Sequence, residues 1–309
     1  MVMKMEAAGP MLVLAIAERT YSSWSLRGHL LVEITGAPCA VRKVDLRTPG
    51  FEALAAEFAP ARSVPMLSVE TQEGPPIRLW DSLAIAETLH ERFPDAGIWP
   101  ADPAARAAAR SLAAEMHSGF SALRRLCPMN LEKVYEGFAP PPDEREALEA
   151  DLARIETLWR WAREGWGAGG PWLFGARFTA ADAFHAPLAS RLVTYGLPRS
   201  DLARAYAEAV HAHPPFRRWR AMGVAERRVV ERYEMDLPQG PRFGPPPRPA
   251  RAVTDRTPLN DACPYSGKPV APDSLAEIDG RVVGFCNPFC RDKSVADADA
   301  WPRLAPLLA

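Results

Sequence analysis

YSSWSLR, at residues 21–27, is the stretch that decides the fold of the first third of the chain. It follows an apolar run at 11–16, which predicts a buried strand, and it leads into 25–34, whose apolar spacing predicts an amphipathic helix. Serine hydroxyls at such a junction are ordinary helix N-caps, because their oxygen accepts a free N–H of the first turn. The stretch therefore predicts a strand, a short loop and a helix, with hydroxyl groups gathered at the helix start.

The same alternation of apolar runs and helical patterns continues to about residue 98. Further strands are predicted at 39–44, 65–69 and 77–79, and further helices at 51–58 and 81–92. The order β-α-β-α-β-β-α indicates a small α/β layer, with strands too closely spaced for a full Rossmann unit. We therefore expect residues 1–98 to form one α/β domain.

The rest of the chain divides into a helical region, a linker and a small tail. From residue 103 to about 234 the pattern is wholly helical, with helices predicted at 103–126, 143–166, from about 180, at 201–211 and after Pro215. Prolines crowd the stretch 237–258 and leave little room for helix or sheet there. The expected units are therefore an all-helical domain at 99–236, a Pro-rich linker at 237–258 and a Cys-containing module at 259–309.

Composition excludes several classes of protein. The 309 residues carry 37 Lys and Arg against 38 Asp and Glu, which argues against a nucleic-acid binder or a polybasic membrane protein. No apolar run approaches the roughly 20 residues that a spanning helix needs. Five cysteines, an odd number, speak against a disulfide framework, and no signal-peptide pattern precedes the first strand. We expect a cytoplasmic protein without a membrane or nucleic-acid partner.

Three further motifs lie downstream. Pro65 opens a predicted strand, where a ladder donor would be lost, and a cis Val64–Pro65 bond would explain its position. Asp81 and Ser82 form another capped helix start. Thr179 and Asp182 have the spacing of a capping box with Asp in place of Glu, a feature that we assign to folding.

Together and in this order, these motifs resemble those of the glutathione transferases over about residues 11–235. The resemblance implies a thioredoxin-like α/β domain followed by an all-α helical bundle. The serine-rich stretch is most similar to the serine-type classes, particularly zeta and its bacterial relatives. Those carry Ser-Ser-Cys-Ser-x-Arg, and Trp24 stands here in place of their Cys, a departure from the maleylacetoacetate isomerase pattern.

The resemblance implies that Ser22 is the catalytic hydroxyl, with Ser23 as the near alternative and Tyr21 as a weaker one. A free thiol has a pKa near 8.5, and lowering it by about two units requires ~2.7 kcal/mol of preferential thiolate stabilisation. A hydroxyl hydrogen bond and the dipole of the helix starting here would both contribute. Ser22 and Ser25 also occupy the places of the thioredoxin cysteines, so dithiol redox chemistry at this pair is excluded.

The other motifs would hold glutathione, the co-substrate. With Pro65 cis, the backbone of Val64 would pair with the cysteinyl unit, Ser82 would bind the γ-glutamyl carboxylate, and Asp81 would meet the ammonium group. Arg62 is either a further anion contact or a surface charge. Candidates for the electrophile pocket by position are His117, Phe120, Arg124 and residues 127–130, although the sequence favours ordinary helix packing for each of them.

The expected function is therefore glutathione transfer to, or glutathione-dependent isomerisation of, a small electrophile by a homodimer. A second hypothesis, from a different class, is a non-catalytic binding or regulatory protein that uses this scaffold and its C-terminal module for a partner or a metal. Intact Ser22, Val64–Pro65 and Asp81–Ser82 motifs favour the enzyme.

The C-terminal module resembles the small YHS/TRASH-type metal-binding modules. Cys263, Cys286 and Cys290 are spaced by 23 and 4 residues, but Ser266 stands where the second cysteine of a Cys-x-x-Cys pair would be. Zinc would need a fourth ligand from Asp292, water or a partner. The sequence favours a metal-free module over a zinc site, because serine is a poor zinc ligand. We expect a β-hairpin and a short helix that pack against the main body.

Overall fold

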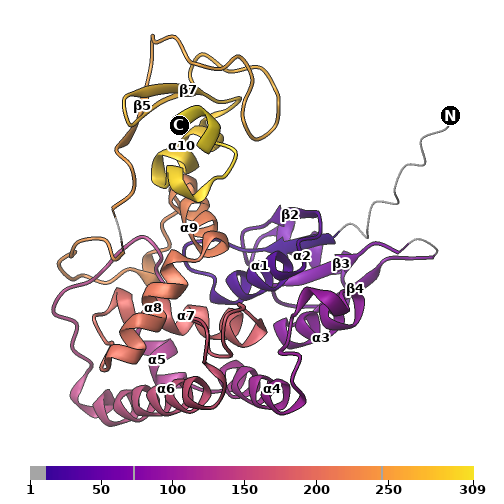
Figure 1. Cartoon of the computed structure of the whole chain (residues 1–309), viewed down its shortest axis with the longest axis vertical. Helices are drawn as coiled ribbons and strands as arrows, with labels where there is room; N and C mark the ends of the chain where they lie inside the picture. Colours follow the sequence, from indigo (N-terminus) through magenta and orange to yellow (C-terminus); the bar gives the residue numbers. More distant parts are fainter. Residues whose placement is uncertain (1–11, 72–73, 245) are drawn as a thin grey trace.

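The computed structural model describes residues 12–71, 74–244 and 246–309 (Figure 1). Residue 11, the start of the first expected strand, and Pro245 of the expected linker lie outside these ranges. None of the helices in the described part of the chain combines the length and apolarity that crossing a bilayer requires.

The N-terminal domain is a four-stranded sheet covered by helices. The strands are β1 (Leu12–Ile16), β2 (Cys39–Lys43), β3 (Met66–Val69) and β4 (Ile77–Trp80), and the helices are α1 (Ser23–Thr35), α2 (Pro49–Glu57) and α3 (Ser82–Arg92). In the strand order β2-β1-β3-β4, β1 runs parallel to β2, whereas β3 is antiparallel to both of its neighbours. This is the thioredoxin-like arrangement that the sequence predicted, with element bounds shifted by one or two residues.

Helix α1 lies against the start of β3 at a point where a side chain would not fit. A Cβ added to Gly28 would lie 2.7 Å from Cβ of Pro65. The missing side chain therefore lets α1 approach the Val64–Pro65 bond, which is cis. The N-terminus of α1 and the segment before β3 are brought together by this contact.

The second domain consists of helices packed around α7. They are α4 (Pro103–Ser118), α5 (Ser121–Leu126), α6 (Arg145–Trp166), α7 (Ala180–Thr194), α8 (Asp201–Ala212) and α9 (Pro214–Glu226), with short 3-10 turns at Pro94–Ala96, Pro142–Glu144 and Glu231–Tyr233. Every residue of α7 is buried. The predicted capping box is confirmed, because Thr179 and Asp182 exchange both of its hydrogen bonds.

One predicted helix of this domain is wrong. The expected single helix at 103–126 ends at Ser118, and a second helix starts at Ser121. Gly119 is extended, and Phe120 has a φ of 59°, so the chain turns between the two. Phe120 is buried at this turn, and packing of its ring offsets the cost of a left-handed backbone.

The C-terminal module is a three-stranded antiparallel sheet with one main helix. Strands β5 (Ala250–Val253), β6 (Leu275–Ile278) and β7 (Arg281–Gly284) lie in that order, followed by α10 (Pro288–Ala296), a 3-10 turn (Ala298–Ala300) and α11 (Ala305–Leu308). The hairpin and helix that the sequence predicted are present. The expectation that 237–258 leaves no room for a strand is wrong, because the proline-free residues 250–257 supply β5.

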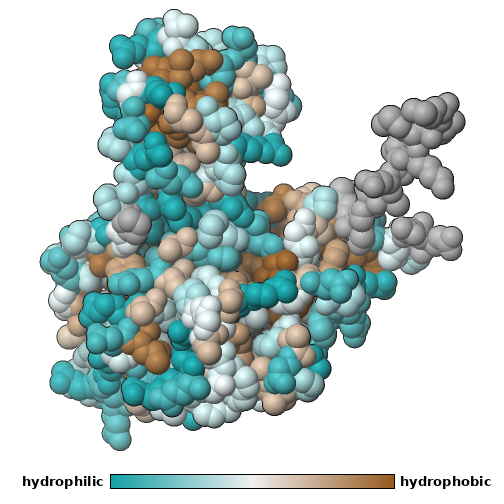
Figure 2. All heavy atoms as spheres, viewed as in Figure 1, coloured by the Kyte–Doolittle hydropathy of each residue, from teal (hydrophilic) through white to brown (hydrophobic). Residues whose placement is uncertain are grey.

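The module docks on α9, the last helix of the body. Ala221 of α9 lies in the same buried cluster as Phe285 and Trp301 of the module. The Asp297 carboxylate, 1% exposed, receives Nε and Nη2 of Arg217 at 3.0 and 2.6 Å. Figures 1 and 2 show the module standing out from the body at the end of α9. The expected packing against the main body is therefore formed through one helix.

Candidate active site

A cavity of about 420 Å³ opens where the first domain meets the second, beside the N-terminus of α1. It brings together four of the residues that the sequence singled out, Ser22, Ser23, Arg62 and Val64. Tyr21 and Trp24 also line it. Pro65, Asp81 and Ser82 do not belong to its lining.

Ser22 caps α1 and shares a hydrogen bond with a buried neighbour. Its Oγ accepts the backbone N–H of Ser25 at 3.3 Å and lies 2.8 Å from Oγ of Ser25. Ser25 is fully buried, and its Oγ also accepts the N–H of Ala17 at 3.0 Å. Two linked hydroxyls therefore stand at the positive end of the α1 dipole, the outer one facing the cavity.

The two alternative hydroxyls differ in how they are engaged. The hydroxyl of Ser23 accepts an N–H of Arg191 Nη2 at 3.5 Å, a bond that does not use the proton of Ser23. Tyr21 donates its hydroxyl to Glu234 at 2.6 Å, and burial together with this carboxylate raises the pKa of Tyr21. A raised phenol pKa makes the proton harder to share with a thiolate, so the geometry favours a serine over Tyr21.

The Asp81–Ser82 pair lies apart from the cavity lining. Asp81 caps α3 through the N–H of Leu83 at 2.8 Å, and its other oxygen lies 3.3 Å from Nε2 of His117. Its φ of 75° is a conformation that side-chain-bearing residues rarely adopt. Ser82 is fully buried, and its Oγ has no hydrogen-bond partner. The expected contact of Ser82 with the γ-glutamyl carboxylate stays a prediction.

The cavity is electropositive. Glu18 is the acidic residue of its lining, against five arginines from five separate segments: Arg47, Arg62, Arg124, Arg191 and Arg232. Burial and the nearby Arg124 together lower the pKa of Arg191 to about 10. Such a site favours a ligand with several negative charges.

A further buried arginine lies behind Trp24. The Arg27 guanidinium is 4.4 Å from the ring centroid of Trp24, and its Nε and Nη1 have no hydrogen-bond partner. Burial and the nearby Arg124 and Arg191 lower the pKa of Arg27. Trp24, where zeta-class proteins have cysteine, thus separates this buried cation from the cavity.

The segment after α9 closes one side of the cavity and was missed by sequence reasoning. Arg232 and Tyr233 line the cavity, and the ring of Tyr233 stacks on that of Tyr21 at 5.6 Å. Glu234 anchors the segment, since it also receives Lys133 at 2.6 Å. A short 3-10 turn next to a Pro-rich stretch gave no sequence signal of this role.

Some of the residues expected in the electrophile pocket line the cavity. Arg124, Pro128 and Met129 line it. His117 contacts Asp81 and Trp24 instead, and burial lowers its pKa. Phe120 and Cys127 pack in the core, as the alternative interpretation of each had it.

The three module cysteines converge. The Sγ atoms of Cys263, Cys286 and Cys290 all lie within 4.8 Å of one another. Ser266 donates its hydroxyl to Sγ of Cys286 at 3.2 Å. Asp292, a candidate fourth ligand, instead pairs with Arg291 at 2.7 Å and Arg227 at 3.0 Å. The carboxylate is therefore turned away from the sulfurs.

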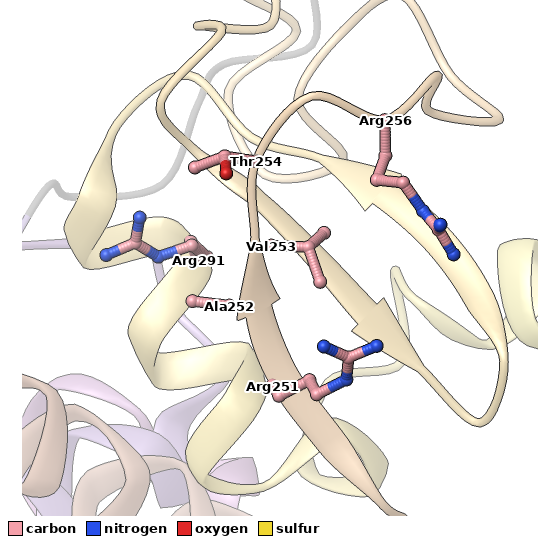
Figure 3. Close-up of a pocket in the computed structure, with 6 residues that line it drawn as sticks. All are labelled: Arg251, Ala252, Val253, Thr254, Arg256 and Arg291. Carbon is pink, nitrogen blue, oxygen red and sulfur yellow. The ribbon is translucent and has the colours of Figure 1, made fainter.

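A second cavity lies on the module beside β5 (Figure 3). Its volume is about 360 Å³, and Arg251, Arg256 and Arg291 dominate its lining. Arg251 and Arg256 both pair with Glu277. Because no acid–base or nucleophilic pair lines the space, this cavity is not the candidate active site.

Two family models match the chain. Residues 21–92 match the glutathione S-transferase N-terminal domain, and residues 144–221 match the glutathione S-transferase C-terminal domain. These two segments of the chain are therefore similar to the two domains of glutathione S-transferases. The cavity described above is lined by residues of both matched segments.

Similar proteins include isomerases of this superfamily. A probable maleylacetoacetate isomerase of Caenorhabditis elegans is 31% identical over 138 residues, which are 44% of this chain and 62% of that protein. Two crystal structures of a maleylacetoacetate isomerase from Anaeromyxobacter dehalogenans have TM-scores of 0.50. One, with bound dicarboxyethyl glutathione and citrate, is 28% identical and covers 75% of this chain and 99% of that one. The other, with bound glutathione, is 27% identical and covers 75% and 100%.

Proposed function

We propose that the protein is a glutathione-dependent enzyme that conjugates or isomerises a small anionic electrophile. The observation that carries the proposal is the Ser22–Ser25 hydroxyl pair at the N-terminus of α1, open to an arginine-rich cavity. Similar proteins crystallised with glutathione support glutathione as the co-substrate.

In this proposal Ser22 stabilises the glutathione thiolate. In the structure Ser22 donates its hydroxyl to Oγ of Ser25, and in this proposal the same proton turns to the sulfur when glutathione binds. The α1 dipole stabilises the same negative charge. The thiolate then forms a bond to the electrophilic carbon, and charge moves onto the carbonyl or carboxylate of the substrate.

The binding roles follow from position. The backbone of Val64, at the cavity edge before β3, would pair with the cysteinyl unit, and Arg62 would bind a carboxylate. Ser82, whose buried Oγ has no hydrogen-bond partner in the structure, would bind the γ-glutamyl carboxylate, and Asp81 would meet the ammonium group. Pro65, which follows Val64 through a cis peptide bond, would shape this edge of the cavity.

The charge of the cavity points to the class of electrophile. Five arginines suit a substrate with carboxylates, and an isomerase of similar fold was crystallised with a glutathione adduct that carries a dicarboxyethyl group. Arg124, Arg191 and Arg232 are the candidates for this role, because Arg62 and Arg47 lie on the glutathione-binding domain.

The test compares Ser22→Ala with Ser63→Ala, which removes another hydroxyl from the same lining. With an α,β-unsaturated dicarboxylate as electrophile, Ser22→Ala should lower turnover by about 100-fold or more. The pKa of the bound thiol, read from thiolate absorbance, should return toward about 8.5 with glutathione affinity little changed. Unchanged turnover in Ser22→Ala would reject the assignment and move it to Ser23.

The docked C-terminal module favours a second candidate, a binding or regulatory protein on the same scaffold. Retention on immobilised glutathione without turnover of any electrophile in a panel would select it.

We further propose a homodimer in the cytoplasm, with domain limits at 98, 236 and 258. Light scattering at micromolar concentration tests the dimer, and a monomeric mass would refute it.

A further inference from the structure

Three sulfurs from separate parts of the C-terminal module meet at one point. Cys263 follows the Pro-rich segment, Cys286 follows β7, and Cys290 lies in the first turn of α10. All three Sγ atoms lie within 4.8 Å of one another. Two sulfurs bound to one tetrahedral zinc ion, each at about 2.3 Å, would lie about 3.8 Å apart, so a small inward movement completes the geometry.

The surroundings are those of a negatively charged centre. Lys293 is only 9% exposed, and its Nζ lies 3.7 and 4.1 Å from the ring centroids of Tyr265 and Trp301. No carboxylate lies within ion-pair distance of this ammonium in the described part of the chain. A buried cation is costly unless it faces negative charge, and three thiolates around a divalent cation carry a net charge of −1.

Ser266 stands beside the remaining position. Its Oγ lies 3.2 Å from Sγ of Cys286 and also accepts the N–H of Lys268 at 3.3 Å. Asn287, which caps α10 through the N–H of Cys290, donates its side-chain N–H to Sγ of Cys286 at 3.2 Å. The cluster is thus held by hydrogen bonds of the kind that orient metal ligands.

We propose that Cys263, Cys286 and Cys290 form a three-thiolate Zn²⁺ site, with the fourth position beside Ser266 taken by its hydroxyl or by water, and with Lys293 balancing the charge. The sequence favoured a metal-free module, and the convergence of three sulfurs on an unpaired lysine outweighs that argument. The module is also about 50 residues long, a size at which a metal commonly supplements a small core.

The first measurement is metal content. The full chain, purified reduced and without chelator, should hold one zinc per molecule by atomic emission. Co²⁺ bound in place of zinc should give an intense sulfur-to-metal charge-transfer band in the near ultraviolet. Addition of zinc should remove this band, because zinc displaces the cobalt. The double variant Cys286→Ser, Cys290→Ser should lose both signals, and Cys39→Ser, which removes a thiol from β2, should keep them.

The double cysteine variant could also lose zinc because it fails to fold, so two single variants are measured as well. Ser266→Cys should tighten zinc by about tenfold or more, since even outer partners of a ligand change affinity on that scale. An unchanged circular dichroism spectrum of this variant would show that the gain arises in a folded chain. Lys293→Met should weaken zinc by about tenfold while the circular dichroism spectrum stays unchanged.

Zinc far below one per chain together with no Co²⁺ band would overturn the proposal. So would an equal zinc content in the double cysteine variant, or no gain from Ser266→Cys. Glutathione turnover is measured in parallel only to show that the body is intact, so failure of the zinc site and failure of the proposed enzyme are separate results.

Discussion

At the scale of single residues, the proposed chemistry rests on the Ser22–Ser25 pair. The hydroxyl of a serine in an exposed loop would rotate freely among water partners. The hydroxyl of Ser22 is instead fixed by two hydrogen bonds to Ser25. The inner hydroxyl is itself anchored on the backbone of Ala17, the residue after β1. The position of the reacting hydroxyl is therefore set by the end of a core strand.

Ser25→Ala tests this coupling. The variant removes the hydroxyl that accepts the proton of Ser22 and holds its side chain in place. We expect turnover to fall about tenfold, less than for Ser22→Ala, since one hydrogen bond is worth about 1 kcal/mol. It also leaves the Ala17 N–H buried without a partner, at a cost of about 1–3 kcal/mol of stability. Steady-state kinetics and thermal melting measure the two effects, and Ser25→Thr should restore part of both.

Sequence patterns located one half of the candidate site. Ser22, Ser23 and Val64 lie at a helix start and a strand start, where local residue types reveal the role. Arg191 and Arg232 were not found, because their position in the cavity depends on how α7 and the segment after α9 pack against the first domain. Tertiary packing of this kind leaves no periodicity to read.

At the scale of elements, the close contact between α1 and Pro65 is the one that a single substitution would disturb most. Gly28→Ala would gain about 1 kcal/mol of helix propensity but place a Cβ 2.7 Å from Pro65. We expect a net loss of about 1–3 kcal/mol and weaker glutathione binding, because α1 and the Val64 edge separate.

Gly165→Ala is the matched control for this contact. Gly165 lies inside α6, and an added Cβ meets nothing within 4 Å, so the variant should gain about 0.5–1 kcal/mol. Urea denaturation compares the two. Equal shifts in the same direction would mean that propensity, rather than the contact with Pro65, governs position 28.

The break between α4 and α5 shows why one element was mispredicted. The pattern of 103–126 is rich in alanine and leucine, and a single glycine inside such a helix costs only about 1 kcal/mol. The backbone turns at Phe120 because the ring finds a buried site between helices. Local propensity therefore favoured a continuous helix, and long-range packing reversed it.

At the scale of the whole molecule, one buried carboxylate fastens the module to the body. Asp297→Asn would weaken both bonds to Arg217 and the longer one from Arg242 at 3.4 Å. Breaking such a pair should cost about 2 kcal/mol or more and increase proteolysis within 237–258. The exposed Arg248–Asp299 pair is the control, and Asp299→Asn should change stability by less than about 0.5 kcal/mol.

Acid should destabilise the folded chain through its buried histidines. Burial lowers the pKa of His29 and His185 to about 4 and that of His211 to about 3. Between about pH 6.5 and 4 the unfolded chain binds protons that the folded chain does not, so stability is full above 6.5 and falls as the pH falls.

Each of these histidines contributes up to about 1.4 kcal/mol per pH unit in that window. Asp182 acts in the opposite direction, because burial raises its pKa to about 6 and favours the folded state at low pH. Urea unfolding at pH 5 and 7.5 measures the balance. His211→Phe should reduce the difference between the two, and a chain equally stable at both values would contradict the argument.

Helix α9 is shared by two cores, since Trp219 lies in that of the body while Ala221 and Met222 lie against the module. A shortened chain that ends before the Pro-rich segment would keep every part of the glutathione cavity up to α7 but leave an apolar strip of α9 in water. Such a fragment should self-associate and be recovered in inclusion bodies, and replacing Met222 by a charged residue should return it to the supernatant.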